Sequence, residues 1–371
     1  MSKRERITRR SLLAALGGAA IAALGPALDG RPRAAEPAAR KNPLPRWRGV
    51  NLLEKFARGD GRRPNRPFVE RDFQWLQRWG FDFARLPMDY RFWIAEGDPR
   101  RFDEAALKEI DQAVEWGRQY GVFVCVNFHR APGYTVNTPP ETLTLWTDEE
   151  AQELCELHWR MFAKRYKGIA SARLGFNLWN EPAEPGRRGL TRESHARVAR
   201  RVVAAIREED PDRLIIADGM RWGQQTLPEL ADLGIAQSTR AYLPSRLTHY
   251  RASWMEGSDE WPVPTWPYQE GNERWDIERL RAHYRPWHEL SRQGVGVHCG
   301  EGGVYRFTPH DVTLAFLRDV LTVLGEYGIG WATWNLRGTF GWIDSQRPDV
   351  QYEDLEGLRL DRKMLELLRS M

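Results

Sequence analysis

The sequence has few cysteines and no long hydrophobic run beyond its first 30 residues. Three cysteines, Cys125, Cys155 and Cys299, stand among 371 residues, and an odd, small number argues against a disulfide framework. Cys125 and Cys299 lie in apolar runs typical of strands, where a buried free thiol is expected. No stretch after residue 30 approaches the roughly 20 apolar residues of a membrane helix. With 42% hydrophobic and 29% charged residues, the composition is that of a globular protein.

Short motifs of cofactor and metal sites are also missing. The first candidate strand runs into RGVNLLEKF without a GxGxxG turn, which argues against a dinucleotide-binding fold. The eight histidines are scattered, and neither HExxH nor CxxC occurs. A metal-dependent barrel hydrolase, which would need paired histidine ligands, is therefore disfavoured. We expect no metal ion and no cofactor.

The first 27 residues differ from the rest of the chain. Basic residues come first, and residues 12–28 are then apolar and rich in Ala and Gly, as in a secretory signal. TRRSLL at 8–13 resembles the twin-arginine motif. The alternative is a membrane anchor, but three glycines and a proline make this run a poor span. We predict a twin-arginine signal over 1–27, a disordered linker over 28–45, and export to the periplasm or the extracellular space.

The net charge of +4 belongs to this signal. Residues 1–27 hold five basic residues and Glu5, a net of +4, so the remainder carries 4 − 4 = 0. A neutral mature chain gives no sign of a nucleic-acid partner. After signal cleavage we expect no stable membrane anchor, and the sequence does not indicate an oligomeric state.

Residues 46–371 alternate between β-rich and helical segments. The candidate strands are Trp47–Leu52, Phe81–Arg85, Val122–Phe128, Arg173–Trp179, Arg213–Ala217, Ala236–Tyr242, Val295–Cys299 and Ile329–Thr333. The candidate helices are Phe68–Trp79, Glu104–Tyr120, Glu149–Tyr166, Arg192–Glu209, Asp276–Gln293, Pro309–Tyr327 and Asp361–Arg369, with a short one at Thr226–Leu233. Such alternation indicates a parallel sheet. Eight units predict an α/β fold, a single (β/α)₈ TIM barrel.

Polar residues cluster where these strands end, which is where a barrel of this kind carries its active site. The strand-end residues are Arg85, Asn127, His129, Asn180, Glu181, Tyr242, Glu301 and Trp334. Alternation of side chains puts His129 on the face of Asn127, pointing inward. It also puts Glu301 on the face of Cys299, towards the barrel interior. His298 then points towards the helices as a structural histidine.

Two of these residues, Glu181 and Glu301, are carboxylates on strands that lie across one barrel mouth. Such a pair suits glycoside hydrolysis, in which one protonated acid donates to the leaving oxygen and one ionised group attacks the sugar carbon. A separation of about 5–5.5 Å would mean a retaining mechanism. Burial would keep the acid protonated, and donors such as Arg85 would keep the nucleophile ionised. For either glutamate alone, a salt bridge is the alternative.

Taken in order, seven segments resemble glycoside hydrolase family 5, the cellulase family of the retaining (β/α)₈ clan. They are RGVNL, FARLPMDY, VNFHRAPGY, NLWNEP, AYLPSRLTHYRASW, HCGEGG and GWATWNLRGTFGWID, and they span about residues 46–345. The resemblance implies a retaining β-glycosidase that hydrolyses a β-glucan or related β-glycoside by double displacement. Glu181 would be the acid/base and Glu301 the nucleophile, and Asn180 would bond the sugar 2-hydroxyl.

The resemblance also implies roles for the remaining strand-end residues. Arg85 and Tyr242 would hydrogen-bond Glu301. His129 would line the subsite of the cleaved sugar, and Trp334 would form its floor. A flat aromatic face also suits the C–H face of a pyranose, although packing within the barrel is the alternative for a strand-end tryptophan.

The sequence departs from the family after the sixth strand. The family usually has a histidine two residues before the tyrosine, but Arg240 stands two residues before Tyr242. Three possibilities follow. The role of that histidine is missing from this protein, or Arg240 fills it, or His249 from the following loop takes it over. The long loop Leu243–Trp275 carries Trp254 and other aromatic residues, which either wall a sugar cleft or pack on one another.

A barrel that binds sugar but has lost catalysis is the competing hypothesis, since Arg240 replaces a family residue. Both glutamates are present, which favours the enzyme. Spacing does not reveal the glycan, the linkage, or whether cleavage is internal or terminal.

Overall fold

The structure is a computed structural model that describes residues 41–56 and 66–371. The predicted export signal and most of the predicted linker lie outside the described residues. Within the described part of the chain, no helix is both long and apolar enough to cross a membrane.

Eight parallel strands form a closed barrel. They are β1 (Arg48–Asn51), β2 (Phe83–Asp89), β5 (Phe123–Ala131), β7 (Leu174–Asn177), β8 (Leu214–Asp218), β9 (Ala236–Ala241), β12 (Val297–Gly302) and β13 (Gly330–Thr333). The strands pair in the order β2-β1-β13-β12-β9-β8-β7-β5, and a pairing between β2 and β5 closes the ring. The predicted (β/α)₈ barrel is confirmed.

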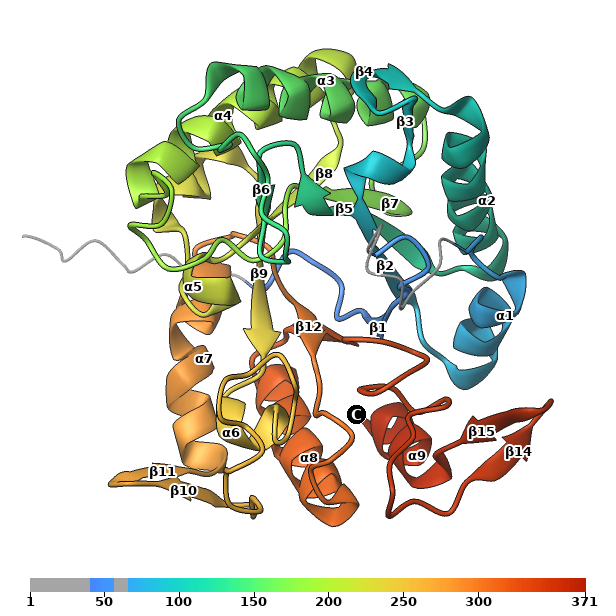
Figure 1. Ribbon diagram of the computed structural model, residues 1–371, viewed down its shortest axis with the longest axis vertical. Helices are drawn as coiled ribbons and strands as arrows, with labels where there is room; N and C mark the ends of the chain where they lie inside the picture. The colour runs from blue at the N-terminus through green and yellow to red at the C-terminus, as the bar shows by residue number, and fades with distance from the viewer. Residues whose placement is uncertain (1–40, 57–65) are drawn as a thin grey trace, which may run out of the picture. The chain divides into compact units, whose positions relative to one another are not determined.

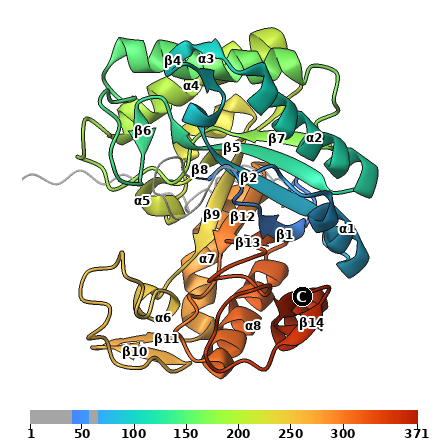
Figure 2. The same cartoon turned by 45° about the vertical axis from the view of Figure 1, so that its right-hand side comes forward.

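Helices surround the strands, as Figures 1 and 2 show. They are α1 (Glu70–Trp79), α2 (Glu104–Tyr120), α3 (Glu149–Arg165), α4 (Arg192–Glu209), α7 (Ile277–Arg292), α8 (His310–Glu326) and α9 (Arg362–Ser370). Each buries an apolar stripe against the outer face of the sheet. The unit after β8 has only α5 (Met220–Gly223) and a 3₁₀ helix, η2 (Pro228–Leu233), where an α-helix at 226–233 was predicted.

The loops contain additional short strands and helices. The hairpins are β3 (Ile94–Ala95) with β4 (Asp98–Phe102), β10 (Tyr268–Glu270) with β11 (Glu273–Trp275), and β14 (Glu353–Leu355) with β15 (Leu358–Leu360). Strand β6 (Tyr134–Thr135) folds back on the end of β5. The 3₁₀ helix η1 (Tyr90–Phe92) and the helix α6 (Ser245–Thr248) follow β2 and β9.

The barrel interior has its own apolar cluster, separate from the layer between strands and helices. It consists of Trp47, Phe83, Phe123, Cys125, Ile216, Ala236 and Ala332. The rings of Trp47 and Phe123 stack with centroids 4.0 Å apart. All three cysteines are buried and free, as predicted for Cys125 and Cys299. These apolar side chains pack one part of the barrel interior. The polar side chains lie in the other part, near the carboxyl ends of the strands.

The prediction that His298 faces the helices is wrong. Its ring lies 4.4 Å from that of Phe83 and 6.1 Å from that of Trp47, inside the barrel. The pairing of β12 with β9 shifts register between Cys299 and Glu301. Such a bulge interrupts the strict alternation of faces. His298 and Glu301 can therefore both face the interior, while Cys299 packs in the layer beneath the helices.

The predicted linker boundary at residue 45 is too late. Asn42 donates to the carbonyl of Val297 over 2.7 Å and accepts from its N–H over 3.0 Å. Leu44 packs against the interior cluster. These contacts could not be predicted from the sequence, because the segment is polar and proline-rich and the partners of Asn42 are backbone groups of a distant strand.

Candidate active site

The barrel brings together most of the residues that the sequence predicted. Glu181 follows β7, Glu301 lies in β12, and Arg85 lies in β2. The strand containing Arg85 runs on to Asp89, so Arg85 lies within the strand rather than at its predicted end. Because the strands are parallel, all these side chains lie towards the carboxyl ends of their strands, at the same end of the barrel.

The backbone turns sharply at Glu181. Strand β7 ends at Asn177, and Glu181 has φ +50°, a left-handed conformation that a non-glycine residue rarely adopts. Two side chains hold it there. Asp218 Oδ2 accepts from the Glu181 N–H over 3.0 Å, and the Tyr134 hydroxyl donates to the Glu181 carbonyl over 2.7 Å. A strained residue fixed from both sides is typical of a functional site.

Glu301 is held by two donors of different kinds. Arg85 Nη1 donates to Glu301 Oε2 over 2.6 Å, and the Tyr242 hydroxyl donates to Oε1 over 3.1 Å. Burial, followed by the charge of Glu301, raises the pKa of Tyr242 well above its ordinary value. The tyrosine therefore keeps its proton and remains a donor. Each oxygen of the Glu301 carboxyl group therefore accepts one hydrogen bond, from an arginine on one side and a tyrosine on the other.

Arg240 contacts both glutamates. Its Nε donates to Glu181 Oε1 over 2.8 Å, and its Nη2 lies 3.6 Å from Glu301 Oε2. The same Nη2 donates to Asn180 Oδ1 over 3.1 Å and pairs with Asp218. Of the three possibilities that the sequence left open, the structure places Arg240 directly on Glu181.

The environment of Glu181 favours its protonated form. Burial raises the pKa of Glu181 to about 8, and the charge of Glu301 adds to the effect. Arg240 opposes this shift, and Asp218 supports it. Two carboxylates that share one site cannot both ionise freely. One of the pair is thus prepared to carry a proton near neutral pH.

Sequence reasoning missed the polar residues beneath this pair. Asp218 ends β8, where it is fully buried. Asn51 and Asn177 accept from Arg85 over 2.9 and 2.8 Å and so orient its guanidinium. The criterion that singled out the other strand ends would also have found Asp218, because it is a carboxylate at the end of an apolar strand.

His129 and Trp334 lie close together on one side of the site. Their ring centroids are 5.4 Å apart, and Phe56 contacts both rings at 4.5 and 5.1 Å. His129 Nε2 lies 3.4 Å from the side-chain nitrogen of Asn180. Trp334 is half-buried, so part of its ring remains accessible.

A second aromatic group includes His249 and Trp254. The His249 ring lies 5.2 Å from that of Tyr242 and 6.1 Å from that of Trp254. Phe340 and Tyr305 pack against Trp254 at 6.2 and 4.9 Å. No hydrogen bond joins His249 to Glu181. Trp254 is 56% exposed, so an aromatic ring that contacts His249 is open to solvent.

The other aromatic residues of the loop Leu243–Trp275 have mixed environments. Tyr268 and Trp275 are buried. Trp266 packs on helix α8 and donates from its indole nitrogen to Asp319 over 2.8 Å. Part of the loop is therefore packed on the protein and part is exposed. Trp254 is the most exposed of its aromatic side chains.

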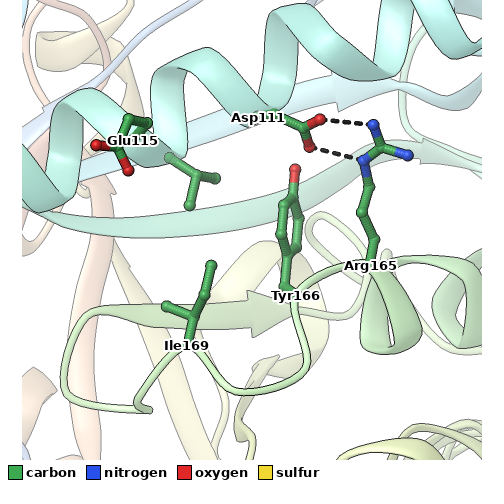
Figure 3. A pocket seen from close by; sticks show the side chains of 6 residues that line it. Asp111, Glu115, Arg165, Tyr166 and Ile169 are labelled. Atoms are coloured by element: carbon green, nitrogen blue, oxygen red, sulfur yellow. Dashed lines mark hydrogen bonds and ion pairs between the residues drawn. The ribbon is translucent and has the colours of Figure 1, made fainter.

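A pocket of about 460 Å³ lies elsewhere on the barrel (Figure 3). It is lined by Asp111, Val114, Glu115, Arg165, Tyr166 and Ile169. Among these residues, Asp111 accepts from Arg165 Nε over 2.7 Å. The pocket lies beside the chain that leads into β7, opposite the carboxyl end of that strand, and none of the predicted site residues lines it.

Residues 41–56 and 66–371 contain no group of three His, Cys, Asp or Glu side chains that could hold a metal ion. The titratable groups at the strand ends are instead paired with arginines and with one another.

Comparisons with known proteins agree with this arrangement. The family model "Cellulase (glycosyl hydrolase family 5)" matches residues 61–339. Endoglucanase C of Acetivibrio thermocellus is 29% identical over 294 residues, which cover 72% of this chain and 84% of that protein. A crystal structure described as a glycoside hydrolase is 40% identical, with a TM-score of 0.83, over 88% of this chain and 99% of that one.

The endoglucanase Cel5A of the hyperthermophile Thermotoga maritima shares the fold at 22% identity. Its TM-score is 0.71, over 87% of this chain and 96% of that one. The matched family model spans three quarters of the chain and includes both glutamates. The chain therefore belongs to the cellulase family, glycosyl hydrolase family 5, and is a glycoside hydrolase.

Proposed function

We propose that this protein is a retaining β-glycosidase that cleaves a β-glucan or related β-glycoside by double displacement. Glu181 is the acid/base and Glu301 the nucleophile. The observation that carries the proposal is the unequal environment of the two carboxylates. Glu181 is prepared to hold a proton, whereas Glu301 accepts from Arg85 and Tyr242.

In the first step Glu301 attacks the anomeric carbon, and the bond from that carbon to the glycosidic oxygen breaks. Glu181 donates its proton to the departing oxygen, so the leaving sugar departs as a neutral alcohol. The product is an ester between the sugar and Glu301. Arg85 and Tyr242 hold the attacking carboxylate in place.

In the second step Glu181, now ionised, takes a proton from water. The water oxygen attacks the anomeric carbon from the side that the first sugar left, and the ester bond to Glu301 breaks. Two inversions give retention of configuration. Glu181 ends the cycle protonated, and the charge of Glu301 is restored.

The neighbouring polar and aromatic residues supply sugar contacts in this proposal. Asn180, fixed by Arg85 and Arg240 over 2.8 and 3.1 Å, hydrogen-bonds the 2-hydroxyl of the reacting sugar. His129 and Trp334 form one wall and the floor of its subsite. Trp334 stacks on the C–H face of the ring.

Trp254 and His249 form a further subsite. Trp254 exposes its ring beside His249, which packs on Tyr242, the donor to Glu301. A sugar bound there would lie one or more units from the cleaved bond, where stacking on an aromatic ring contributes to binding without taking part in the chemistry.

The substrate class is supported by the curated relative. Endoglucanase C, by its name, cleaves glucan internally, and the match covers most of both chains. We therefore favour a β-glucan. The proposal extends to export: residues 1–27 act as a twin-arginine signal, and the mature enzyme works in the periplasm or outside the cell.

The test is hydrolysis by the mature protein, residues 28–371, beside Glu301→Ala. The panel contains β-1,4-glucan, β-1,3-glucan, mannan, xylan and aryl β-glycosides. The wild type should cleave a β-glucan and Glu301→Ala should not. NMR of the first product should show the β-anomer, because the mechanism retains configuration.

A sugar-binding barrel that has lost catalysis is the second candidate, and Arg240 is the observation that favours it. Calorimetry with the same glycans separates the two. Binding without turnover would support the binding barrel, and turnover that Glu301→Ala abolishes would exclude it.

A further inference from the structure

Two fully buried charges lie beneath the proposed catalytic pair and take no part in the double displacement itself. Arg240 and Asp218 are both 0% exposed, and they pair with one another. A buried charge is tolerated only where it is paired and hydrogen-bonded. Their presence beside Glu181 therefore needs a reason of its own.

Asp218 accepts hydrogen bonds and donates none. Its Oδ1 accepts from Asn177 Nδ2 over 2.9 Å, and its Oδ2 accepts from the Glu181 N–H and from Arg240 Nη2. Three donors satisfy a carboxylate. Arg85 Nη2 lies 3.6 Å from the same Oδ2. Asp218 thus stands between the two arginines that contact the two glutamates.

Arg240 is fixed along its whole length. Its Nη1 donates to Ser238 Oγ over 2.9 Å and to the Thr239 carbonyl over 3.0 Å. Gly223 leaves room for its stem, since a Cβ there would lie 2.6 Å from Arg240 Cγ. The guanidinium therefore presents its Nε to Glu181 in one orientation.

The charges of this cluster balance when one of its three carboxyl groups carries a proton. Arg85 and Arg240 contribute +2, while Glu301 and Asp218 contribute −2. The cluster is neutral when Glu181 is protonated. If Asp218 were absent, the cluster would be neutral only with Glu181 ionised, the wrong state for a general acid.

We propose that Asp218 is a positioning residue that cancels the charge of Arg240, so that Arg240 orients Glu181 without holding it ionised. The inference rests on the proposed role of Glu181. An arginine in direct contact with a carboxyl group lowers its pKa by about 1–3 units when nothing opposes it. The buried Asp218 supplies that opposition, and the pair acts as a neutral orienting group.

Other groups also face Glu181 and remain unchanged in the test. They are Glu301 on β12, Tyr134 on β6 and Tyr242 after β9. Arg85 on β2 and His129 on β5 contact the adjacent Asn180. Replacing Asp218 on β8 or Arg240 on β9, one at a time, therefore isolates the contribution of this pair to the pKa of Glu181.

The experiment titrates Glu181 directly, in protein labelled with ¹³C at the glutamate side-chain carboxyl. The Glu181→Gln spectrum identifies its resonance. The variants are Asp218→Asn, Arg240→Gln and the double variant. Asp210→Asn is the control, because Asp210 forms a buried ion pair with Arg213 away from the site. The readout needs no turnover, so it tests the pair even if every glycan in the panel proves inert.

Asp218→Asn should lower the pKa of Glu181 by about one unit or more. Arg240→Gln should raise it, and the double variant should return it to within a few tenths of the wild type. Asp210→Asn should leave it unchanged. If the role of Asp218 and Arg240 were purely structural, the variants would change the melting temperature without shifting the pKa of Glu181 in opposite directions. An unchanged pKa of Glu181 in Asp218→Asn would overturn the proposal.

If Asp218→Asn does not fold, the comparison of Arg240→Gln with Arg240→Lys decides. Lysine keeps the charge, so only glutamine should raise the pKa of Glu181. Equal titrations in these two variants would overturn the proposal. In the active enzyme, the alkaline limb of kcat/KM on an unactivated oligosaccharide should move in the same directions.

Discussion

Replacing Glu181 by glutamine tests the proposed acid most directly. Glutamine keeps an oxygen for Arg240 but has no proton to donate in the required pH range. With a pKa of about 8, about nine-tenths of Glu181 is protonated at pH 7. An ordinary glutamate with pKa 4.5 would be protonated in about 1 molecule in 300, since 7 − 4.5 = 2.5 units.

The assay compares two substrates over pH 5 to 10. On an unactivated cello-oligosaccharide, Glu181→Gln should lose roughly 10²–10⁴-fold in kcat/KM at pH 7, the usual contribution of a general acid. The alkaline limb near pH 8 should disappear. On a dinitrophenyl β-cellobioside, whose leaving group needs no proton, the first step should lose far less. Azide, which needs no general base, should restore turnover and form the β-glycosyl azide.

The matched control is Glu184→Gln. Glu184 lies in the same loop, pairs with Arg221 over 2.6 Å and is half exposed, so its replacement should leave the pH profile unchanged. Equal losses on the two substrates, or an alkaline limb that persists in Glu181→Gln, would refute the assignment of Glu181 as the acid.

Three further properties can be measured. Trp254→Ala should raise KM on a long glucan roughly 2- to 10-fold, the worth of one aromatic stacking contact, with kcat on aryl glycosides unchanged; an unaltered KM would exclude a subsite there. Burial lowers the pKa of His158 to about 4 and of His195 and His298 to about 3. Because the unfolded chain binds protons first, the free energy of unfolding in urea should fall as pH drops from about 6.5 to 4, by about 1.4 kcal/mol per histidine per pH unit; a constant value would contradict this. EDTA should leave hydrolysis unchanged, since the proposed mechanism uses two carboxylates and no metal ion; inactivation that Zn²⁺ or Ca²⁺ reverses would refute that.

The order of strands and helices could be predicted because it depends on local pattern. Apolar runs such as FNLW at 176–179 and amphipathic stretches such as 104–120 show in sequence which face each segment buries. Helices α2 and α4 have the predicted bounds. The unit after β8 is the exception, because its short segment forms a 3₁₀ helix rather than an α-helix.

The strand-end rule found both glutamates, Arg85 and Tyr242, because a parallel barrel collects the ends of its strands at one mouth. It missed Asp218, and the face of His298 was predicted wrongly. Both depend on the pairing between strands: a bulge in β12 changed which residues face the interior, and the pairing of β8 with β9 brought Asp218 to Arg240.

The sequence by itself determined the barrel, its eight units and the residues at its mouth, because burial periodicity and strand ends are properties of short segments. Only the tertiary structure decided that Arg240 bonds Glu181, that Asp218 balances it, and that residues 41–45 belong to the barrel. Those contacts join segments far apart in the chain, and their geometry depends on register, bulges and closure of the sheet, which no local pattern encodes.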